Sequence, residues 1–427
     1  MRKYFDWVRS ALFSATAKDT FILFVGNTAS AFWGFLFTLF IARAVSIAEF
    51  GIFSAAINLV TILSSLADVG ISSGSVNFVS EHFAKGDSKK ADEYVKASFV
   101  IRILIVLAIS AVVIIFAPFV STKLLATRDP SVAVWAAIIP IFIFPDMFFP
   151  YILQAKKKFL HSTIIDNAFY IGRLLFALAF YVYGGLNISR AFWAFGAGFI
   201  VETILVIYFV RTDFIFSNPT KNEYKNLLKF SGWIGVNRII SSISGRLDIQ
   251  MLATMAGAFA TGLYSIPSRL ASFIVVLSGS FSSVLAPRFA AFGDKMSERK
   301  YLVKSTLAIL PITAGIIFWI IIAKPFILVL FGTKYLASVP VFQALAAAQI
   351  PFLFTAPSVS AIIYAMKKTV FIGAYSFFQI AAIFLLNFFL IPKFGVFGPT
   401  ITLGATNLIL AVFTWVIVIR HYWVESK

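Results

Sequence analysis

The chain has 427 residues, of which 60% are hydrophobic and 13% are charged, and its mean hydropathy is +0.92. An ordinary soluble domain is about 45–50% apolar and about 25% charged, so this composition excludes a soluble globular protein and indicates an integral membrane protein. The absence of cysteine excludes disulfides, thiol catalysis and iron–sulfur ligation. The net charge of +18 is compatible with two kinds of anionic partner, nucleic acid and anionic lipid.

The first 20 residues predict an interfacial amphipathic helix. Aromatic side chains such as Phe5 and Trp7 would face lipid, and basic ones such as Lys3 and Arg9 would face phosphate headgroups. This segment lacks the uninterrupted apolar core and the cleavage site of a signal peptide.

Apolar runs of about 20 residues follow along the whole chain and predict transmembrane helices rather than the shorter, alternating strands of a barrel. We expect an all-α membrane protein with twelve transmembrane helices. The expected spans are 21–43, 48–70, 97–119, 131–154, 161–183, 189–211, 229–253, 259–286, 303–323, 338–365, 369–391 and 396–420.

The loops set the orientation. Lysine and arginine concentrate in the loops on the N-terminal side of the membrane, among them residues 85–96, 156–158, 211–229 and 288–304. By the positive-inside rule, this asymmetry places both termini in the cytoplasm and the chain in the cytoplasmic membrane as a multi-pass protein. Basic loops account for the net charge through topology and membrane-lipid attraction, so we expect no nucleic-acid partner.

A weak internal repeat suggests two halves. "EFGIFSAAI" resembles "TGLYSIPSR", which aligns Gly51 with Gly262. We expect an N-lobe of six helices at 21–211, a cytoplasmic linker at 212–228 and a C-lobe of six helices at 229–427, enclosing a central cavity. Chance similarity between apolar helices is the alternative.

Five arginines fall inside the expected spans, where a charge near the bilayer centre costs about 2.5–3.5 kcal/mol and usually faces a cavity or a partner. At 100° per residue, Arg238 and Gly245 lie on one face of the seventh span, with Arg246 and Asp248 about 80° to either side. This broad polar face either lines a cavity or lets another helix approach closely. The five are Arg102, Arg173, Arg238, Arg246 and Arg269.

In the fifth span, Asp166, Tyr170 and Arg173 recur on one face at i, i+4 and i+7. Arg173 and Glu202 reach similar depths in neighbouring spans, so they either form a structural ion pair or serve a ligand. Asp68 and Asp166 lie near cytoplasmic span ends, where we expect them to be hydrated.

In the second half, Asp248 and Arg269 are expected at similar depth and would pair likewise. Arg238 and Arg246 then have no obvious acidic partner in that half. Guanidinium groups lining a cavity suit a phosphate or a pyrophosphate, whose oxygens match their paired N–H groups.

No catalytic constellation appears: the sequence has no glycine-rich phosphate loop, no nucleophile–base pair, and three histidines without metal-ligand spacing. We therefore expect no enzyme activity, no metal site and no cofactor. Uphill transport would need an ion gradient, of H+ or Na+.

The segment 27–87, which begins "NTASAFWGFLFTLFIARAVSIAEFGIFSAAI", resembles the start of the polysaccharide-biosynthesis flippases, and "RLDIQMLATMAGAFATGLYSIPSRL" resembles their second-half signature. These proteins are O-antigen-type flippases for lipid-linked oligosaccharides, within the multidrug/oligosaccharidyl-lipid/polysaccharide exporter superfamily. The resemblance implies a bundle of two lobes that moves a polyprenyl-diphosphate-linked oligosaccharide by alternating access. We expect a monomer, with polysaccharide polymerase machinery as a further partner. The resemblance also implies diphosphate contact by Arg246 and Arg269, with Arg238 and Arg173 as additions, and arginine orientation or ion coupling by Asp248 and Glu202.

Two other functions stay open. One is an ion-coupled multidrug or small-molecule antiporter of the same superfamily, although such antiporters rely on intramembrane acids and none lies between Phe21 and Ile41. The other is a membrane-embedded glycosyltransferase, which needs acidic or metal-binding outer loops that are nearly missing here. The lipid-II flippase branch differs by its fourteen spans and its basic first helix.

Overall fold

The computed structural model describes residues 15–210 and 212–424, and within them the secondary structure is entirely helical. The expected interfacial helix lies outside the described residues up to position 14. Residues 15–20 belong to α2 (Ala15–Ala44).

Eleven helices within the described residues are long and apolar enough to span a membrane, which confirms the all-α membrane class. Ten of the expected spans match one of these helices to within a few residues at most ends, and the expected eighth span lies inside a longer helix, Leu247–Ala291. The count of twelve is not reached because the helix that contains most of the expected seventh span, 229–253, is long enough but not apolar enough to be among them.

That span is divided at Gly245. α11 (Lys221–Ser244) ends there, and α12 (Leu247–Ala291) begins two residues later. α12 itself bends at Gly257, where φ is 84° and the backbone leaves the helical region. The single polar face expected from Arg238 to Asp248 is therefore wrong, because helical periodicity does not continue through a break.

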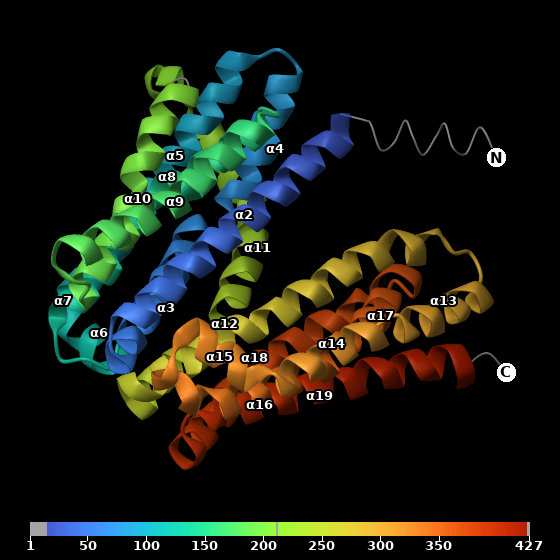
Figure 1. The fold of residues 1–427 in the computed structure, drawn as a ribbon. Coiled ribbons are helices and arrows are strands. Elements are labelled where there is room, and N and C mark those ends of the chain that lie inside the picture. Colours follow the sequence, from blue (N-terminus) through green and yellow to red (C-terminus); the bar gives the residue numbers. More distant parts are fainter. Residues whose placement is uncertain (1–14, 211, 425–427) are drawn as a thin grey trace. The chain divides into compact units, whose positions relative to one another are not determined.

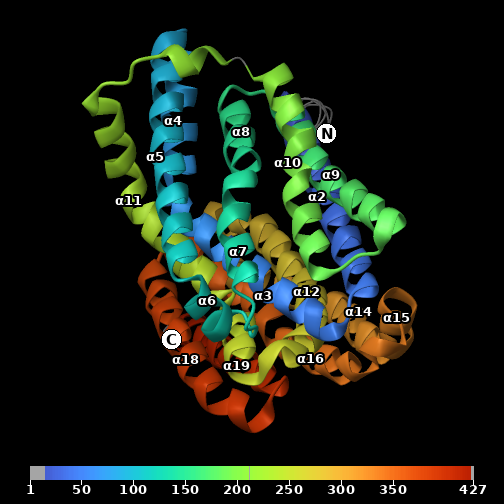
Figure 2. The same cartoon turned by 90° about the vertical axis from the view of Figure 1, so that its left-hand side faces the viewer.

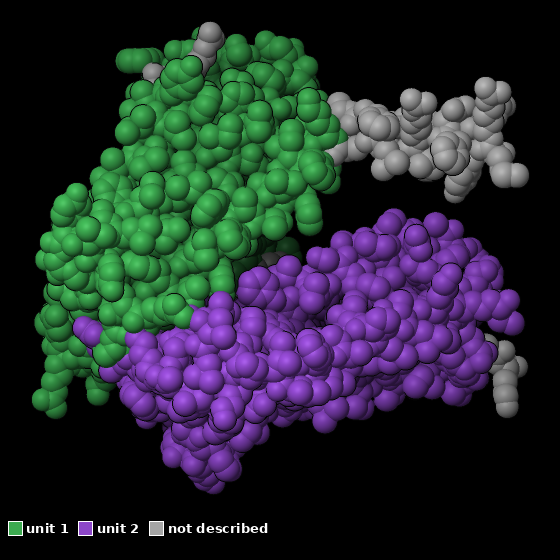
Figure 3. Space-filling view, in the orientation of Figure 1, with its two compact units in different colours: residues 1–46, 56–245 green, residues 47–55, 246–427 purple. Residues whose placement is uncertain are grey.

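The chain forms two compact units, coloured in Figure 3: residues 1–46 with 56–245 make unit 1, and residues 47–55 with 246–427 make unit 2. α3 (Ile47–Asp68) contributes its first nine residues to unit 2 and the rest to unit 1. The lobes expected at 21–211 and 229–427 were defined by the number of spans and the internal repeat, not by contacts. They therefore stay a prediction.

In unit 1, α9 packs along both α2 and α10, and α4 and α5 run side by side (Figures 1 and 2). Its core is apolar and aromatic, with Phe148, Ile165 and Leu227 almost fully buried. Besides α2, α3 and α11, the unit contains α4 (Ile71–Ala84), α5 (Ser88–Ile115), α6 (Ala117–Leu124), α7 (Pro130–Phe142), α8 (Phe144–Ala155), α9 (Phe159–Gly184), α10 (Ile188–Phe209) and the 3-10 turn η1 (Thr212–Phe216).

A proline divides the expected fourth span into α7 and α8. Pro145 has no N–H to donate, so the helix stops at Ile143 and restarts with the proline in its first turn. The restart places Asp146 in the first turn of α8, where helix N–H groups favour a carboxylate.

The start of α11 is fixed to α5. Thr220 and Glu223 form a capping box, and Lys90 of α5 forms an ion pair with Glu223 at 2.5 Å. Burial raises the pKa of Glu223, but hydrogen bonds from Lys90 and Thr220 outweigh burial and lower this pKa to about 2. Glu223 is therefore ionised at neutral pH.

Unit 2 has two buried clusters, one around Tyr264 and Leu345 and one around Phe289 and Tyr422. After α12 its elements are α13 (Lys295–Leu307), α14 (Leu310–Ile321), α15 (Ala323–Phe331), η2 (Thr333–Ser338), α16 (Val339–Leu353), α17 (Thr355–Ser360), the π-helical turn η3 (Ala361–Ala365), α18 (Thr369–Phe394), α19 (Phe397–Ile419) and the π-helical turn η4 (Arg420–Val424).

The two glycines aligned by the repeat meet within unit 2. A Cβ added to Gly51 of α3 would lie 1.9 Å from the carbonyl oxygen of Ala258, and one added to Gly262 of α12 would lie 2.0 Å from that of Ile47. Ile47 precedes Gly51 by four residues, as Ala258 precedes Gly262. The contact is therefore reciprocal, as two-fold related copies would make it.

We predict that Gly51→Ala and Gly262→Ala each destabilise the protein, by about 1–3 kcal/mol or more, since the methyl group overlaps backbone that cannot rotate away. Thermal unfolding of the purified protein measures the effect. Gly279→Ala in α12 is the matched control, because nothing lies within 4 Å of its added Cβ. Unchanged unfolding of both glycine variants would contradict the crossing.

Candidate functional site

Unit 1 contains a cavity of about 550 Å³ lined mainly by polar and charged side chains. The lining residues of α3, α4, α5 and α11 include both cations, Arg102 and Arg238, and form what we call the cationic side; those of α2, α8 and α9 include Asp146 and Asp166 and form the acidic side. The lining residues are Asn27, Ser65, Asp68, Ser72, Arg102, Asp146, Met147, Pro150, Tyr151, Gln154, Ser162, Thr163, Asp166, Tyr170 and Arg238.

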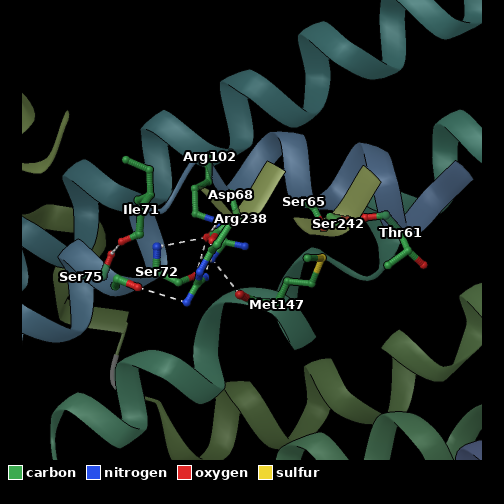
Figure 4. A network of polar contacts seen from close by, with 11 residues as sticks. Thr61, Ser65, Asp68, Ile71, Ser72, Ser75, Arg102, Met147, Arg238 and Ser242 are labelled. Carbon is green, nitrogen blue, oxygen red and sulfur yellow. Dashed lines mark hydrogen bonds and ion pairs between the residues drawn. The ribbon is translucent and has the colours of Figure 1, made fainter. Parts of the chain in front are cut away.

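One carboxylate joins two arginines on the cationic side (Figure 4). Arg238 donates from Nη1 to Asp68 Oδ2 at 2.6 Å, and Arg102 Nε lies 3.6 Å from Asp68 Oδ1. Arg102 also donates to Ser72 Oγ at 3.0 Å and to the carbonyl of Met147 at 2.7 Å. Two guanidinium groups and one carboxylate leave this cluster with a charge of about +1.

The local backbone explains why Asp68 occupies this place. Asp68 ends α3, and the turn to α4 passes through Val69 and Gly70, whose φ values are 41° and 75°. Asp68 Oδ1 then accepts hydrogen bonds from the amide and the hydroxyl of Ser72, at 3.1 and 2.5 Å, near the start of α4.

Glycines bring α11 against that turn. A Cβ on Gly235 would lie 2.4 Å from the carbonyl oxygen of Val69, and one on Gly70 would lie 2.7 Å from the backbone of Gly235. Only glycine permits this approach. It places Arg238, three residues further along α11, within reach of Asp68.

The two arginines differ in access. The Arg102 side chain is 3% exposed, whereas the Arg238 side chain is 42% exposed. Arg238 spends one further donor on Ser73 Oγ, at 3.1 Å. Since a guanidinium carries five N–H groups, Arg238 keeps donors for a ligand in the cavity.

On the acidic side, Asp146 of α8 and Asp166 of α9 both line the cavity. Asp146 Oδ1 is buried and has no hydrogen-bond partner among the described residues. Asp166 also accepts a short hydrogen bond from Ser30 of α2. The Tyr170 ring lies one helical turn beyond Asp166 and completes this side.

Arg173 does not line the cavity. Its guanidinium lies 4.2 Å from the centroid of Tyr170 and 4.9 Å from that of Phe37, with Phe195 and Phe169 at 5.1 and 5.4 Å. Cation–π contacts of this kind stabilise a desolvated cation. Arg173 is thus held behind the cavity wall by aromatic rings, with the charges of the Asp146 and Asp166 carboxyls nearby.

Glu202 of α10 is fully buried, and neither of its carboxyl oxygens has a hydrogen-bond partner among the described residues. The structure contains no Arg173–Glu202 ion pair within its described part. Of the two roles left open for these residues, the structural pair is therefore wrong.

The remaining predicted residues lie in unit 2. Arg246 precedes the first turn of α12, and Asp248 in that turn accepts hydrogen bonds from the Tyr264 hydroxyl at 2.8 Å and from the Ile249 amide at 2.7 Å. Arg246 is the cation whose charge acts on Asp248. Arg269 lies further along α12 and is exposed.

Sequence reasoning underrated the carboxylates. Asp68 was expected to be hydrated, but it is 5% exposed and its oxygens are taken by Ser72 and the two arginines. Arg238 was predicted to have no obvious acidic partner in the second half of the chain, and the partner that it has, Asp68, lies in the first half. The face shared by Asp166 and Tyr170 was the signal that pointed to the cavity.

A multi-span helical chain with a charged cavity inside one helical unit has the architecture of a membrane transporter. The sequence profile of the family described as "Polysaccharide biosynthesis protein" matches residues 16–293, more than half of the chain. The chain therefore belongs to the polysaccharide biosynthesis protein family.

Individual relatives agree with this assignment. Over 378 residues the chain is 22% identical to a Shigella flexneri protein named "Putative O-antigen transporter", a match that covers 85% of this chain and 88% of that protein.

Solved structures share the fold. "Lipid II flippase MurJ, inward closed conformation" is 16% identical with a TM-score of 0.74, covering 93% of this chain and 87% of that one. "Inward-facing conformation of a multidrug resistance MATE family transporter of the MOP superfamily" is 13% identical with a TM-score of 0.73, covering 95% and 99%. The fold class expected from the sequence is thus confirmed.

We predict that Asp68→Asn destabilises the protein by about 3–5 kcal/mol, because it leaves the buried Arg102 without a counter-charge. Thermal unfolding measures the loss. Asp213→Asn, at an exposed aspartate of η1, is the matched control. The double variant Asp68→Asn/Arg102→Met should recover most of the loss; equal instability of the single and double variants would contradict the pairing.

Proposed function

We propose that the protein is a flippase that moves a polyprenyl-diphosphate-linked oligosaccharide from the cytoplasmic to the outer leaflet by alternating access. It acts as a monomer in the cytoplasmic membrane, with both termini in the cytoplasm, and supplies polysaccharide polymerase machinery. The observation that carries the proposal is the net positive cluster of Asp68, Arg102 and Arg238 at the cavity, with Arg238 accessible to a ligand.

Membership of the polysaccharide biosynthesis family supports this substrate class, as do a relative named for O-antigen and a fold shared with a lipid II flippase. The sequence also lacks catalytic motifs, and its relatives are named as transporters and a flippase, so we assign the protein no chemical step.

The diphosphate binds beside Arg238, which provides both positive charge and N–H donors. Arg238 uses only part of its guanidinium on Asp68 and Ser73, and its remaining N–H groups match phosphate oxygens. Arg102 stays buried and keeps Asp68 neutralised, so that the carboxylate does not repel the phosphate. Arg246 and Arg269, the diphosphate contacts predicted from the sequence, lie in unit 2 and stay a separate proposal within that unit.

Ion coupling is assigned to Glu202 and Asp248. A carboxyl group inside the membrane without a cation in contact is a candidate proton carrier, and Glu202 is fully buried with both oxygens unbonded among the described residues. Asp248 is held by Tyr264 and lies near Arg246, which suits orientation of that arginine.

The antiporter alternative is supported by the fold shared with a multidrug transporter. The cluster of Asp68, Arg102 and Arg238 favours an anionic headgroup over a cationic drug where the ligand contacts Arg238, whereas Asp146 and Asp166 of the same cavity are the residues that an antiporter would use for a cation.

We predict that Arg238→Ala slows flipping about 10- to 100-fold, the loss expected when a charge-assisted hydrogen bond is removed. Liposomes carrying the protein and a fluorescent, short-chain polyprenyl-diphosphate glycan measure this rate through a membrane-impermeant quencher. Arg238→Lys keeps the charge, and its flipping rate should lie between those of the wild type and Arg238→Ala.

Arg128→Ala, at an exposed arginine distant in sequence from the cavity residues, is the matched control, and thermal unfolding identifies any variant that fails to fold. Wild-type flipping by folded Arg238→Ala would remove Arg238 from the site. Wild-type flipping by folded Arg246→Ala and Arg269→Ala would remove those two residues.

We predict that Glu202→Gln still moves the substrate down its gradient but loses the acceleration given by an imposed proton gradient, since glutamine cannot carry the proton. The same liposomes, with and without a pH difference, measure this ratio. A gradient response equal to that of the wild type would exclude Glu202 as the coupling residue.

A further inference from the structure

We propose that the acidic side of the cavity, formed by Asp146 and Asp166 with the Tyr170 ring, selects an uncharged sugar next to the diphosphate and excludes a uronic acid. This inference rests on the proposed function and names the substrate class within it.

Cationic and acidic sides meet on α8. Asp146 belongs to the acidic side, while the carbonyl of its neighbour Met147 accepts a hydrogen bond from Arg102. Residues of α8, α9 and α11 line the same cavity, so in this proposal a ligand whose phosphate contacts Arg238 reaches α8 and α9 with its next group. The volume of about 550 Å³ lies in the range of pockets that enclose small molecules, so one cavity accommodates both groups.

The chemistry of the acidic side suits hydroxyl groups. Asp146 and Asp166 present carboxyl oxygens that accept hydrogen bonds, and Asn27 and Gln154 at the same cavity have amides that both donate and accept. The Tyr170 ring, one side of which faces the Arg173 guanidinium, adds apolar surface to the cavity lining for the C–H groups of a sugar. An uncharged sugar, which carries several hydroxyls and no ionised group, is satisfied by this set.

A carboxylate on the sugar is not satisfied by this set of groups. The cations that line the cavity, Arg102 and Arg238, are both joined to Asp68, and the charge of Arg173 is enclosed by aromatic rings. A uronic acid would thus place an ionised group beside the carboxyls of Asp146 and Asp166. Like-charge contacts of this kind are how binding sites reject a wrong partner.

Asp166 is the residue to change. Asparagine keeps an oxygen that accepts from Ser30, so Asp166→Asn preserves that hydrogen bond while replacing one of the two carboxyls by a neutral amide. It also presents a donor to a sugar carboxylate.

The experiment compares two probes in the same liposomes: fluorescent short-chain polyprenyl diphosphate carrying a single N-acetylglucosamine, or a single glucuronic acid. We expect the wild type to flip the first at least about tenfold faster than the second, and Asp166→Asn to narrow that ratio by accelerating the acidic probe. Asp213→Asn, the exposed control, should leave the ratio unchanged. A ratio between two probes is insensitive to a general loss of folded protein.

Equal flipping of both probes by the wild type would overturn the inference and leave the flippase function intact. A wild-type ratio that Asp166→Asn does not change would also overturn it, by moving selectivity to other residues. If neither probe moved, the proposed function would fail, and this inference with it.

Discussion

The structure of unit 1 depends on one carboxylate in the membrane region that serves two arginines. Asp68 binds the start of α4 through Ser72, neutralises the buried Arg102 of α5 and holds Arg238 of α11. An isolated charge in this environment is expensive, whereas a cluster in which most donors have acceptors is tolerated. Asp68 thus joins four helices, counting its own, and the remaining positive charge appears on Arg238, the more accessible of the two arginines.

Glycines let the helices approach closely enough for such clusters to form. Gly70 and Gly235 remove the side chains that would separate α11 from the turn after α3. Gly34 of α2 serves a related purpose, since a Cβ there would lie 2.8 Å from Arg173 Nη2 and 3.3 Å from the Tyr170 ring. In a membrane, where no hydrophobic effect presses helices together, this close approach also supplies the packing energy.

Hydropathy predicted most of the fold because a membrane span needs a long apolar run, which is a local property of the sequence. The intramembrane arginines were also predicted, because a charged residue inside an apolar run is visible in the local sequence. Their partners were not, since Asp68 and Arg238 are 170 residues apart and no local pattern reports such a contact. The prediction of the seventh span as one helix was wrong because periodicity assumes an unbroken helix, whereas the helix is interrupted at Gly245.

Counting cations in the sequence overstates how many face the cavity, and the difference bears on transport. Arg173 is enclosed by aromatic rings and Arg102 is buried against Asp68, so Arg238 is the exposed cation among the residues lining this cavity. A transporter must release what it binds, and binding energy that holds the ground state too tightly slows turnover. One accessible guanidinium, already shared with a carboxylate, attracts a diphosphate yet can exchange it, because Asp68 stays beside Arg238 as the competing anion when the substrate leaves.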